Sequence, residues 1–345
     1  MAYTTIDDPG LFFNTVLYTG TGSSLANTGV GFQPDFTWIK GRSGATEHVL
    51  TDSVRGVTKE LSSNDTGAEE TVAQGLTAFG SDGFTVGTDG SYNTSSATYA
   101  GWSWLAGGTA SSNTDGSITS TVSANTTSGF SIVSYTGTGA NNTVGHSLGV
   151  KPSMFIIKER GASGEGWNIY HKSLGATKYI MLQSTNASAT SSTLFQNTEP
   201  TSSVFSVGAD AGTNGSTKTY IAYCFAEKQG FSKFGSYTGN GSTDGTFIYT
   251  GFKPAFVLLK RTDSTGSWYI YDNKRDSDNV MTRNLFPDGN FVEDDNSNNN
   301  ADFLSNGFKI RTVSPARNAS GGSYIYMAFA ENPFVTSTAI PACAR

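Results

Sequence analysis

One stretch of sequence occurs three times in the chain of 345 residues and constrains its fold more than any other feature. Each copy has Tyr-Thr-Gly-x-Gly, a short polar segment, then Gly-x-x-Pro, an apolar run and a closing Lys. The copies cover residues 18–40, 135–158 and 237–260. Repeated segments of this kind indicate a structural unit that has been copied along the chain. The sequence therefore predicts three related modules.

Each module carries the same series of short strand patterns. A Pro is tolerated at the first position of a strand, so the run after Gly-x-x-Pro is predicted to be a strand. Asp-Gly and Asn-Gly turn signals at Asp82 and Asn306 precede further alternating strands. No helical period is found, which predicts an all-β protein built of three tandem β-sandwich modules of the jelly-roll kind. The equivalent positions expected to be core are Phe36, Trp38 and Ile39; Met154, Ile156 and Ile157; and Phe256, Leu258 and Leu259.

Spacing between the repeated motifs sets the module boundaries. Module 1 is expected at residues 1–106, module 2 at 129–228 and module 3 at 229–345. The Ser-, Thr- and Gly-rich connection 107–128 is either a flexible linker or an extra strand, with the strand slightly favoured. The connection between modules 2 and 3 is so short that these two modules are expected to pack together rigidly.

Composition excludes several classes of protein. Charged residues make up only 14% of the chain, the net charge is -6, and Lys and Arg are scattered, so a nucleic-acid partner is not expected. Membrane insertion is not expected either, because no run of about 18 apolar residues exists. The first ten residues lack the regions of a secretory signal, which predicts a soluble chain that is not exported that way. Cys224 and Cys343 are expected to be free thiols.

Few residues suggest chemistry. Asp52 with Arg55, and Asp272 with Arg275, share a three-residue spacing that favours a local ion pair or turn over a catalytic dyad. A glycosidase needs two carboxylates at a set separation, and the equivalent position in module 2 is His171. The lysines that close the repeated stretch are interpreted as solvated strand ends or guards of a sheet edge, with ligand contact as the alternative. They are Lys40, Lys158 and Lys260.

Metal, phosphate and stacking sites are also weighed. Residues 293–295 (Glu-Asp-Asp) offer oxygen ligands for calcium, but a solvated acidic loop is favoured because the spacing fits no EF-hand. Tyr-Thr-Gly-x-Gly lacks the ending of a phosphate-binding loop and is read as a turn. The three histidines, His48, His146 and His171, form no metal triad. Exposed Trp could stack on sugars, yet core packing is expected for Trp102, Trp104, Trp167 and Trp268.

Several motifs together resemble a known family. They are Phe-Asn-Thr-Val-Leu-Tyr-Thr-Gly from residue 13, the copy at 31–40, Asp-Ser-Val-Arg-Gly at 52–56, Ser-Asp-Gly-Phe-Thr-Val-Gly at 81–87 and the segment 113–122. This combination resembles repeat proteins of tailed bacteriophages, especially marine and cyanobacterial phages. The resemblance implies a concanavalin-like, virion-associated protein of the tail-fibre kind and carries no catalytic residues with it. Module 3 departs most, at the acidic, Asn-rich residues 291–300.

The expected function follows from the repeat, the neutral polar surface and the resemblance. We expect a phage virion protein, on the tail or another surface appendage, that attaches to the host envelope by binding saccharide. A capsid decoration or structural adaptor is the alternative, and a polysaccharide depolymerase is a third reading. No enzymatic activity, cofactor, catalytic residue or metal is expected, and the ligand-binding residues are unknown. Expected partners are other virion proteins, a host glycan or receptor, and further copies of the chain; phage appendages are commonly trimers, although no heptad supports one here. The expected location is the surface of the particle, after assembly in the host cytoplasm.

Overall fold

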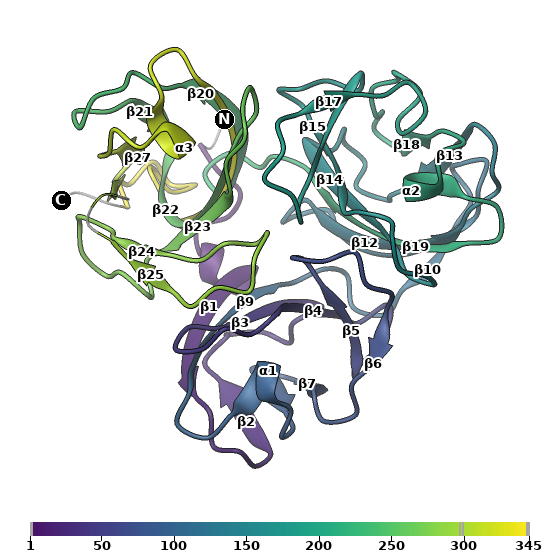
Figure 1. The fold of residues 1–345 in the computed structure, drawn as a ribbon, viewed down its shortest axis with the longest axis horizontal. Coiled ribbons are helices and arrows are strands. Elements are labelled where there is room, and N and C mark those ends of the chain that lie inside the picture. The colour runs from purple at the N-terminus through teal and green to yellow at the C-terminus, as the bar shows by residue number, and fades with distance from the viewer. Residues whose placement is uncertain (1–2, 297, 299, 343–345) are drawn as a thin grey trace.

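The computed structural model of the protein describes residues 3–296, 298 and 300–342. Its strands pair antiparallel in several sheets, which confirms the predicted all-β fold class. The sheets fall into three groups arranged around a common centre, one group for each repeated segment (Figure 1). None of the described helices is long and apolar enough to cross a membrane.

Module 1 pairs a large sheet with a small one. The six-stranded sheet has the order β1-β9-β3-β4-β5-β6, and the three-stranded sheet has the order β2-β8-β7. The strands are β1 (Phe13–Thr19), β2 (Leu25–Thr28), β3 (Phe36–Gly41), β4 (His48–Asp52), β5 (Lys59–Ser62), β6 (Glu70–Thr71), β7 (Leu76–Gly80), β8 (Gly83–Val86) and β9 (Thr98–Trp104).

Module 2 has an eight-stranded sheet, β10-β11-β12-β19-β14-β15-β16-β17, and the pair β13-β18. The connection 107–128 contributes the whole of β10 and β11, so the prediction of an extra strand is confirmed over that of a flexible linker. β11 pairs with β12 along its whole length. The strands are β10 (Ser111–Asn113), β11 (Ser120–Asn125), β12 (Phe130–Thr136), β13 (Asn142–Gly145), β14 (Met154–Glu159), β15 (Asn168–His171), β16 (Lys178–Met181), β17 (Ala189–Thr190), β18 (Val204–Val207) and β19 (Thr219–Phe225).

Module 3 has a four-stranded sheet, β20-β28-β22-β23, a three-stranded sheet, β21-β27-β26, and the short pair β24-β25. Main-chain hydrogen bonds also join Ile270 of β23 to Leu285, just after β24. The strands are β20 (Ser232–Thr238), β21 (Phe247–Tyr249), β22 (Phe252–Arg261), β23 (Trp268–Asp272), β24 (Arg283–Asn284), β25 (Asp294–Asp295), β26 (Ala301–Leu304), β27 (Gly307–Ile310) and β28 (Ser323–Pro333).

The structure also contains three single helical turns that the sequence does not predict, because one turn is too short to show a helical period. They are α1 (Gly90–Asn93), α2 (Ala211–Asn214) and α3 (Pro315–Asn318), besides the 3-10 turn η1 (Pro9–Leu11). The repeated Tyr-Thr-Gly-x-Gly motif contacts one of these helical turns in each module, which explains why the motif is repeated. The second Gly of the motif donates its N–H to the carbonyl of the Asn that ends the helix, at 2.9–3.0 Å in modules 1 and 3 and 2.8 Å in module 2. The motif is therefore a turn, as predicted, and it holds the helical turn in place.

The first Gly of the motif is required for close approach. A Cβ on Gly20, Gly137 or Gly239 would lie 2.2 to 2.3 Å from a main-chain oxygen just after the helical turn. The Tyr of the motif stacks on a Tyr of the neighbouring strand, with ring centroids 4.8 to 5.1 Å apart in the three modules. Both steric fit and aromatic stacking thus favour the same residues at all three copies.

The core positions predicted from the repeat are buried, but much of the core they form is shared between modules. Phe36, Met154 and Phe256 all belong to one cluster built from every module, while Ile39, Ile157 and Leu259 belong to three separate clusters between the large and small sheets. At the centre, the Phe36 and Tyr223 rings lie 4.4 Å apart, and those of Phe225 and Phe329 lie 6.1 Å apart. Alternate residues of one strand therefore serve two different cores.

This double burial explains the strand patterns. Every residue of β3 and of β14 is buried, as in strands covered on both faces. Contacts between the N-terminal segment and module 3 close the arrangement, since Thr4 Oγ1 donates to the Gln229 carbonyl at 2.8 Å and Tyr3 Oη donates to the Gly251 carbonyl at 2.7 Å. Module 1 consequently contacts both of the other modules.

Candidate functional site

The predicted ion pair of module 1 is confirmed, and it reaches into module 2. Arg55 Nε donates to Asp52 Oδ2 at 2.5 Å, with both side chains fully buried, and Asp52 Oδ1 accepts the main-chain N–H of Arg55 at 2.8 Å. From β19 of module 2, Tyr223 Oη donates to Asp52 Oδ2 at 2.8 Å. The carboxylate is thus engaged by the fold.

The pair in module 3 repeats this arrangement with another donor. Arg275 Nε donates to Asp272 Oδ2 at 2.5 Å, again with both side chains fully buried. Here the donor from the neighbouring module is Trp102 of β9, whose Nε1 lies 3.0 Å from Asp272 Oδ2. Asp52 and Asp272 consequently belong to two separate contacts between modules, and neither carboxylate is placed as one half of a catalytic pair.

His171 takes the same position at the contact between modules 2 and 3. Its Nδ1 accepts the Ser173 N–H at 3.1 Å, which leaves Nε2 to donate to the Tyr326 carbonyl at 3.2 Å. The residue of β28 that corresponds to Tyr223 and Trp102 is Met327, which has no donor to offer. Burial lowers the pKa of His171 to about 4, so the imidazole is neutral. Where His replaces Asp, the neighbouring module therefore offers a carbonyl acceptor in place of a side-chain donor.

A second set of ion pairs overturns the prediction of a solvated acidic loop at Glu293, whereas Asp295 is exposed as predicted. Instead of lying in a solvated loop, Glu293 is largely buried and accepts from Arg42 Nη2 at 2.8 Å and Arg275 Nη1 at 3.1 Å. Glu69 does the same in module 1, where Arg160 Nε donates to it at 2.8 Å. Burial raises the pKa of Glu69 and Glu293, but the paired arginines outweigh it and hold both pKa values below the ordinary one.

The three repeated lysines are buried, so their interpretation as solvated ends or edge guards is wrong. Each ammonium donates to main-chain carbonyls, and two of them cross to the preceding module: Lys158 Nζ lies 3.5 Å from the Thr66 oxygen and Lys260 Nζ lies 3.1 Å from the Thr185 oxygen. Lys40 Nζ donates to the Gly41 oxygen at 2.7 Å. Burial lowers the pKa of Lys40 and of Lys260 to about 8. Their strands end at a neighbouring module instead of at solvent.

Other candidates have structural roles. The four Trp residues are buried, as predicted, and none can stack on an external sugar. Burial lowers the pKa of His48 and of His146 below the ordinary value. No group of three His, Cys, Asp or Glu side chains that could hold a metal lies within the described residues, so the calcium alternative gains no support. Cys224 is a buried free thiol, and Cys343 lies outside the described residues.

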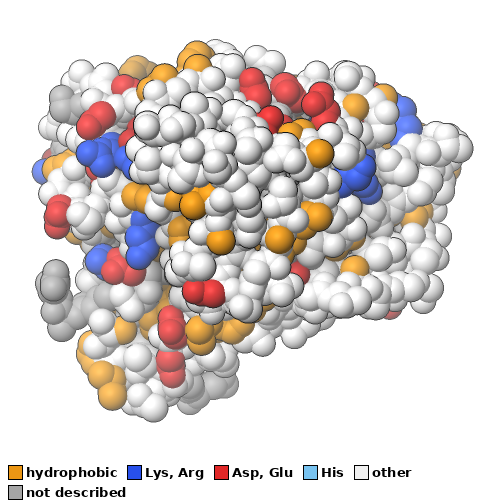
Figure 2. Space-filling model, turned by 90° about the horizontal axis from the view of Figure 1, so that it is seen from below, with side chains coloured by type: hydrophobic (Ala, Val, Ile, Leu, Met, Phe, Trp, Pro, Cys, Tyr) orange, Lys and Arg blue, Asp and Glu red, His pale blue; other side chains and the backbone are white. Residues whose placement is uncertain are grey.

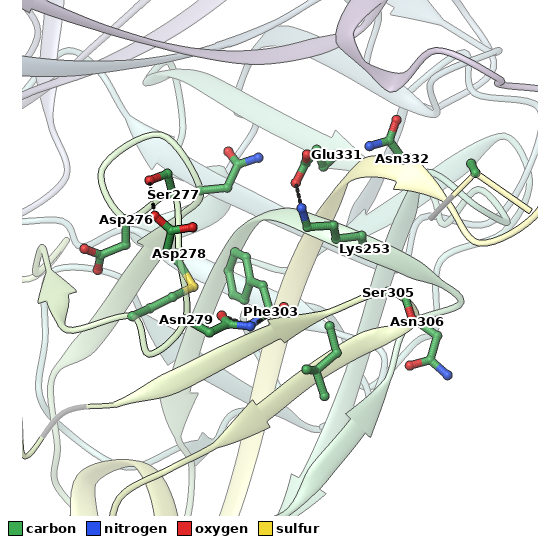
Figure 3. Close-up of a pocket in the computed structure, with 14 residues that line it drawn as sticks. Lys253, Asp276, Ser277, Asp278, Asn279, Phe303, Ser305, Asn306, Glu331 and Asn332 are labelled. Carbon is green, nitrogen blue, oxygen red and sulfur yellow. Dashed lines mark hydrogen bonds and ion pairs between the residues drawn. The ribbon is translucent and has the colours of Figure 1, made fainter. Parts of the chain in front are cut away.

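A pocket of about 760 Å³ opens in module 3 (Figure 3). It lies between the loop that joins β23 to β24 and the strands β22, β26 and β28. This volume is within the range of small-molecule sites. Its lining is mainly polar, with Phe303 and Met281 among the few apolar side chains. Sequence reasoning did not find the pocket, because its loop wall, residues 276–279, lies outside the repeated motifs.

The loop side of the pocket is held in place by its own hydrogen bonds. The side-chain amide of Asn279 both donates to the Phe303 carbonyl and accepts the Phe303 N–H, each at 2.8 Å, so it pairs with β26 as a strand residue would. Asp276 Oδ2 accepts the main-chain N–H groups of Thr282 and Arg283, each at 2.8 Å. Ser277 Oγ donates to Asp278 at 3.0 Å. These hydrogen bonds fix the position of the loop wall.

The opposite side carries polar groups that remain free. Lys253 Nζ pairs with Glu331 at 2.8 Å, which uses both charges. Within the described part of the chain, the side chains of Ser305 and Asn332 have no hydrogen-bond partner, and Asn273 Oδ1 has none either. Amides and hydroxyls can donate and accept, so these groups can bind a ligand that does the same.

Charged side chains are spread over the surface, whereas exposed aromatic side chains are concentrated in module 3. Charged side chains are scattered over the face seen in Figure 2, most of which is uncharged. Among the residues that the structure describes, the exposed aromatic side chains are Phe247, Tyr249 and Phe291, exposed by 44%, 54% and 59%, and all three belong to module 3. Phe247 and Tyr249 lie on β21, at the edge of its sheet, and Tyr3 Oη lies 3.4 Å from Tyr249 Oη.

In a comparison with known families, residues 8–333 match a family described as a domain of unknown function (DUF7483). The chain belongs to this family. The match spans all three sheet groups and the connection between the first two, so the DUF7483 domain comprises the whole three-part arrangement and is not one sandwich. No curated protein matches the sequence.

Proposed function

We propose that this DUF7483 protein is a structural component of a tailed-phage particle that attaches the particle to the host envelope by binding a surface saccharide. The observation that carries the proposal is the polar pocket of module 3 with its unpartnered amide and hydroxyl groups. Hydroxyl-rich ligands suit such groups, because each sugar hydroxyl can both donate and accept.

Two further features support attachment. Asp52 and Asp272, which occupy equivalent positions of modules 1 and 3, are held by buried arginines and are not free to take part in hydrolysis. The scattered surface charge favours recognition by hydrogen bonds and shape over attraction to a highly charged polymer (Figure 2). Several copies of the chain on one particle would raise the overall avidity of a weak site. The partners in this proposal are other virion proteins, further copies of the chain and the host glycan.

Binding of the purified protein to host cells tests the proposal. Saturable binding that soluble envelope polysaccharide competes away is expected, together with no release of reducing ends from that polysaccharide. Absence of binding at high protein concentration would contradict attachment. Release of reducing ends would instead favour a depolymerase.

A second candidate, a capsid decoration or structural adaptor, is favoured by one observation. Phe247 and Tyr249 project from the edge strand β21, and exposed aromatic groups at a sheet edge are suited to contact with another protein. Locating the chain in a cryo-EM map of the particle separates the candidates. Burial of β21 against a capsid protein supports the adaptor, and a module 3 pocket that faces outward from the tail supports attachment.

A further inference from the structure

We infer that module 3 is the ligand-binding module and that each chain holds one saccharide site, for an uncharged saccharide, in the pocket beside residues 276–279. This inference rests on the proposed function and deepens it. It departs from the simplest expectation for three related modules, which is three equivalent sites. The arguments are a local difference in chain length, the way modules 1 and 2 use the corresponding region, and the charges at the pocket.

Module 3 has four extra residues at the pocket. The strand register aligns Leu61, Ile180 and Leu285, because they pair with Leu50, Ile169 and Ile270 respectively. Arg55 precedes Leu61 by six residues, and Leu174 precedes Ile180 by six, whereas Arg275 precedes Leu285 by ten. The added length carries residues 276–279, which form one wall of the pocket. The pocket wall is thus formed by residues that modules 1 and 2 lack.

In module 2 the Glu199 carboxylate occupies the corresponding region and holds its loop closed. Glu199 accepts from Lys151 Nζ at 2.7 Å, from Tyr170 Oη at 2.5 Å and from the Ala176 N–H at 2.8 Å. Lys151 and Lys253 occupy the same place in the repeated motif, so the two modules use one lysine differently. In module 2 it holds the short loop through Glu199, and in module 3 it pairs with Glu331 beside an open pocket.

The short loop of module 1 is also closed, here by main-chain hydrogen bonds. The Thr58 N–H donates to the Leu76 carbonyl at 2.8 Å, and the Thr58 carbonyl accepts the Val72 N–H at 2.8 Å. The loop therefore lies directly against the segment that leads into β7. The longer loop of module 3 instead reaches across to β26 through Asn279.

The charges at the pocket favour an uncharged ligand. Asp276, Asp278 and Glu331 contribute three carboxylates, against the Lys253 ammonium, which is paired with Glu331, and Arg283, whose Nε lies 3.7 Å from Asp276. An anionic sugar would meet net negative charge there and would be repelled. Among the described residues, the groups left for binding include the amides of Asn273 and Asn332 and the hydroxyl of Ser305. These groups match a neutral, hydroxyl-rich chain.

The experiment uses the full chain and an array of neutral and acidic oligosaccharides, followed by calorimetric titration with the best-binding member. We expect a neutral oligosaccharide to bind at one per chain. Ser277→Trp should abolish binding by filling the pocket, and Asn332→Ala should weaken it by about five- to tenfold through loss of an amide contact. The matched controls in module 2, Ser192→Trp and Asn141→Ala, replace exposed side chains and should leave binding unchanged.

Each outcome separates the inference from the proposed function. Binding that both pocket variants leave unchanged, or a stoichiometry of three per chain, would overturn the single site and leave attachment standing. Preference for acidic oligosaccharides would overturn the ligand class. Failure of the unaltered protein to bind any glycan or host cell would overturn the proposed function and the inference together. An unchanged thermal unfolding midpoint for Asn332→Ala shows that its weaker binding is not caused by loss of fold.

Discussion

The contacts of module 1 with modules 2 and 3 differ from the contact between modules 2 and 3 at one buried position. In the first two contacts an Asp is paired with an Arg three residues on and accepts from Tyr223 or Trp102. In the third contact the position is His171, the Arg is replaced by Leu174, and the donor by Met327. The difference teaches that the position requires satisfied polar atoms more than it requires charge. Three residues from two modules change together to achieve this.

The largest expected effect comes from breaking the Asp52–Arg55 ion pair at the contact between modules 1 and 2. Arg55→Ala leaves Asp52 buried without its ion-pair partner, and we expect a loss of about 3–5 kcal/mol in the free energy of unfolding. The matched variant Leu174→Ala removes only a partly buried apolar side chain and should cost about 1–2 kcal/mol. Denaturant unfolding measures both. Equal losses would show that the ion pair adds nothing to what packing supplies.

Low pH should destabilise the contact between modules 2 and 3, where the buried position is His171. Burial lowers the pKa of His171 from 6.5 to about 4. Between these pH values the unfolded chain binds a proton that the folded chain does not, so stability is fully present above pH 6.5 and falls as the pH drops towards 4. The contribution is roughly 3 kcal/mol. His171→Gln should reduce the loss of stability over this window by that amount, as followed by denaturant unfolding at several pH values. An identical pH profile for the variant would refute a neutral, buried His171.

A smaller effect is expected from the donor on the neighbouring module. Tyr223→Phe removes the hydroxyl that donates to Asp52 and should cost about 1.5–3 kcal/mol, because the acceptor is charged and stays buried. Met327→Leu at the corresponding position of β28 should cost less than about 1.5 kcal/mol. The two free energies of unfolding come from the same denaturant series. If Met327→Leu were the costlier change, the hydrogen bond to Asp52 would not be what distinguishes the contacts.

The smallest effect concerns Ser188, which takes the place of Glu69 and Glu293. The N–H of each of these three residues donates to the carbonyl of the residue two positions after a repeated lysine. Ser188 Oγ donates to the Thr262 carbonyl at 2.9 Å, and the Ser188 N–H donates to the same oxygen at 2.9 Å. Ser188→Ala keeps the main-chain bond and should cost about 0.5–1.5 kcal/mol. Glu69→Ala, which leaves Arg55 and Arg160 without this carboxylate, should cost more. The reverse order would mean that the uncharged contact depends on its side chain more than the charged ones do.

Much of the fold could be predicted because its signals are local. Turn motifs, alternating strands and the three-residue spacing of Asp52 and Arg55 depend on near neighbours, and the structure contains them. The burial of Lys40, Lys158 and Lys260 could not be predicted, since the carbonyls that bind two of them belong to another module. Likewise, an apolar position in a strand does not reveal whether it faces its own sandwich or a neighbour.

The pocket could not be predicted for a related reason. Its free groups come from the ends of distant strands and from a loop that breaks the repeat, so no local pattern marks it. One signal was present in the sequence, namely the four extra residues between Arg275 and Leu285, which appear only when the modules are aligned by strand register. Comparing repeats for their differences as well as their similarities would have found this segment.

The central claim is that one core shared by three modules makes the chain a single cooperative unit. Scanning calorimetry tests it most directly, with Phe256→Ala as the probe, because the Phe256 ring contacts Phe13 and Trp102 of module 1 as well as Phe329 of its own module. We expect one transition whose calorimetric and van't Hoff enthalpies agree, and a variant in which that whole transition moves to lower temperature. Separate transitions, with only one of them moved by Phe256→Ala, would contradict the account.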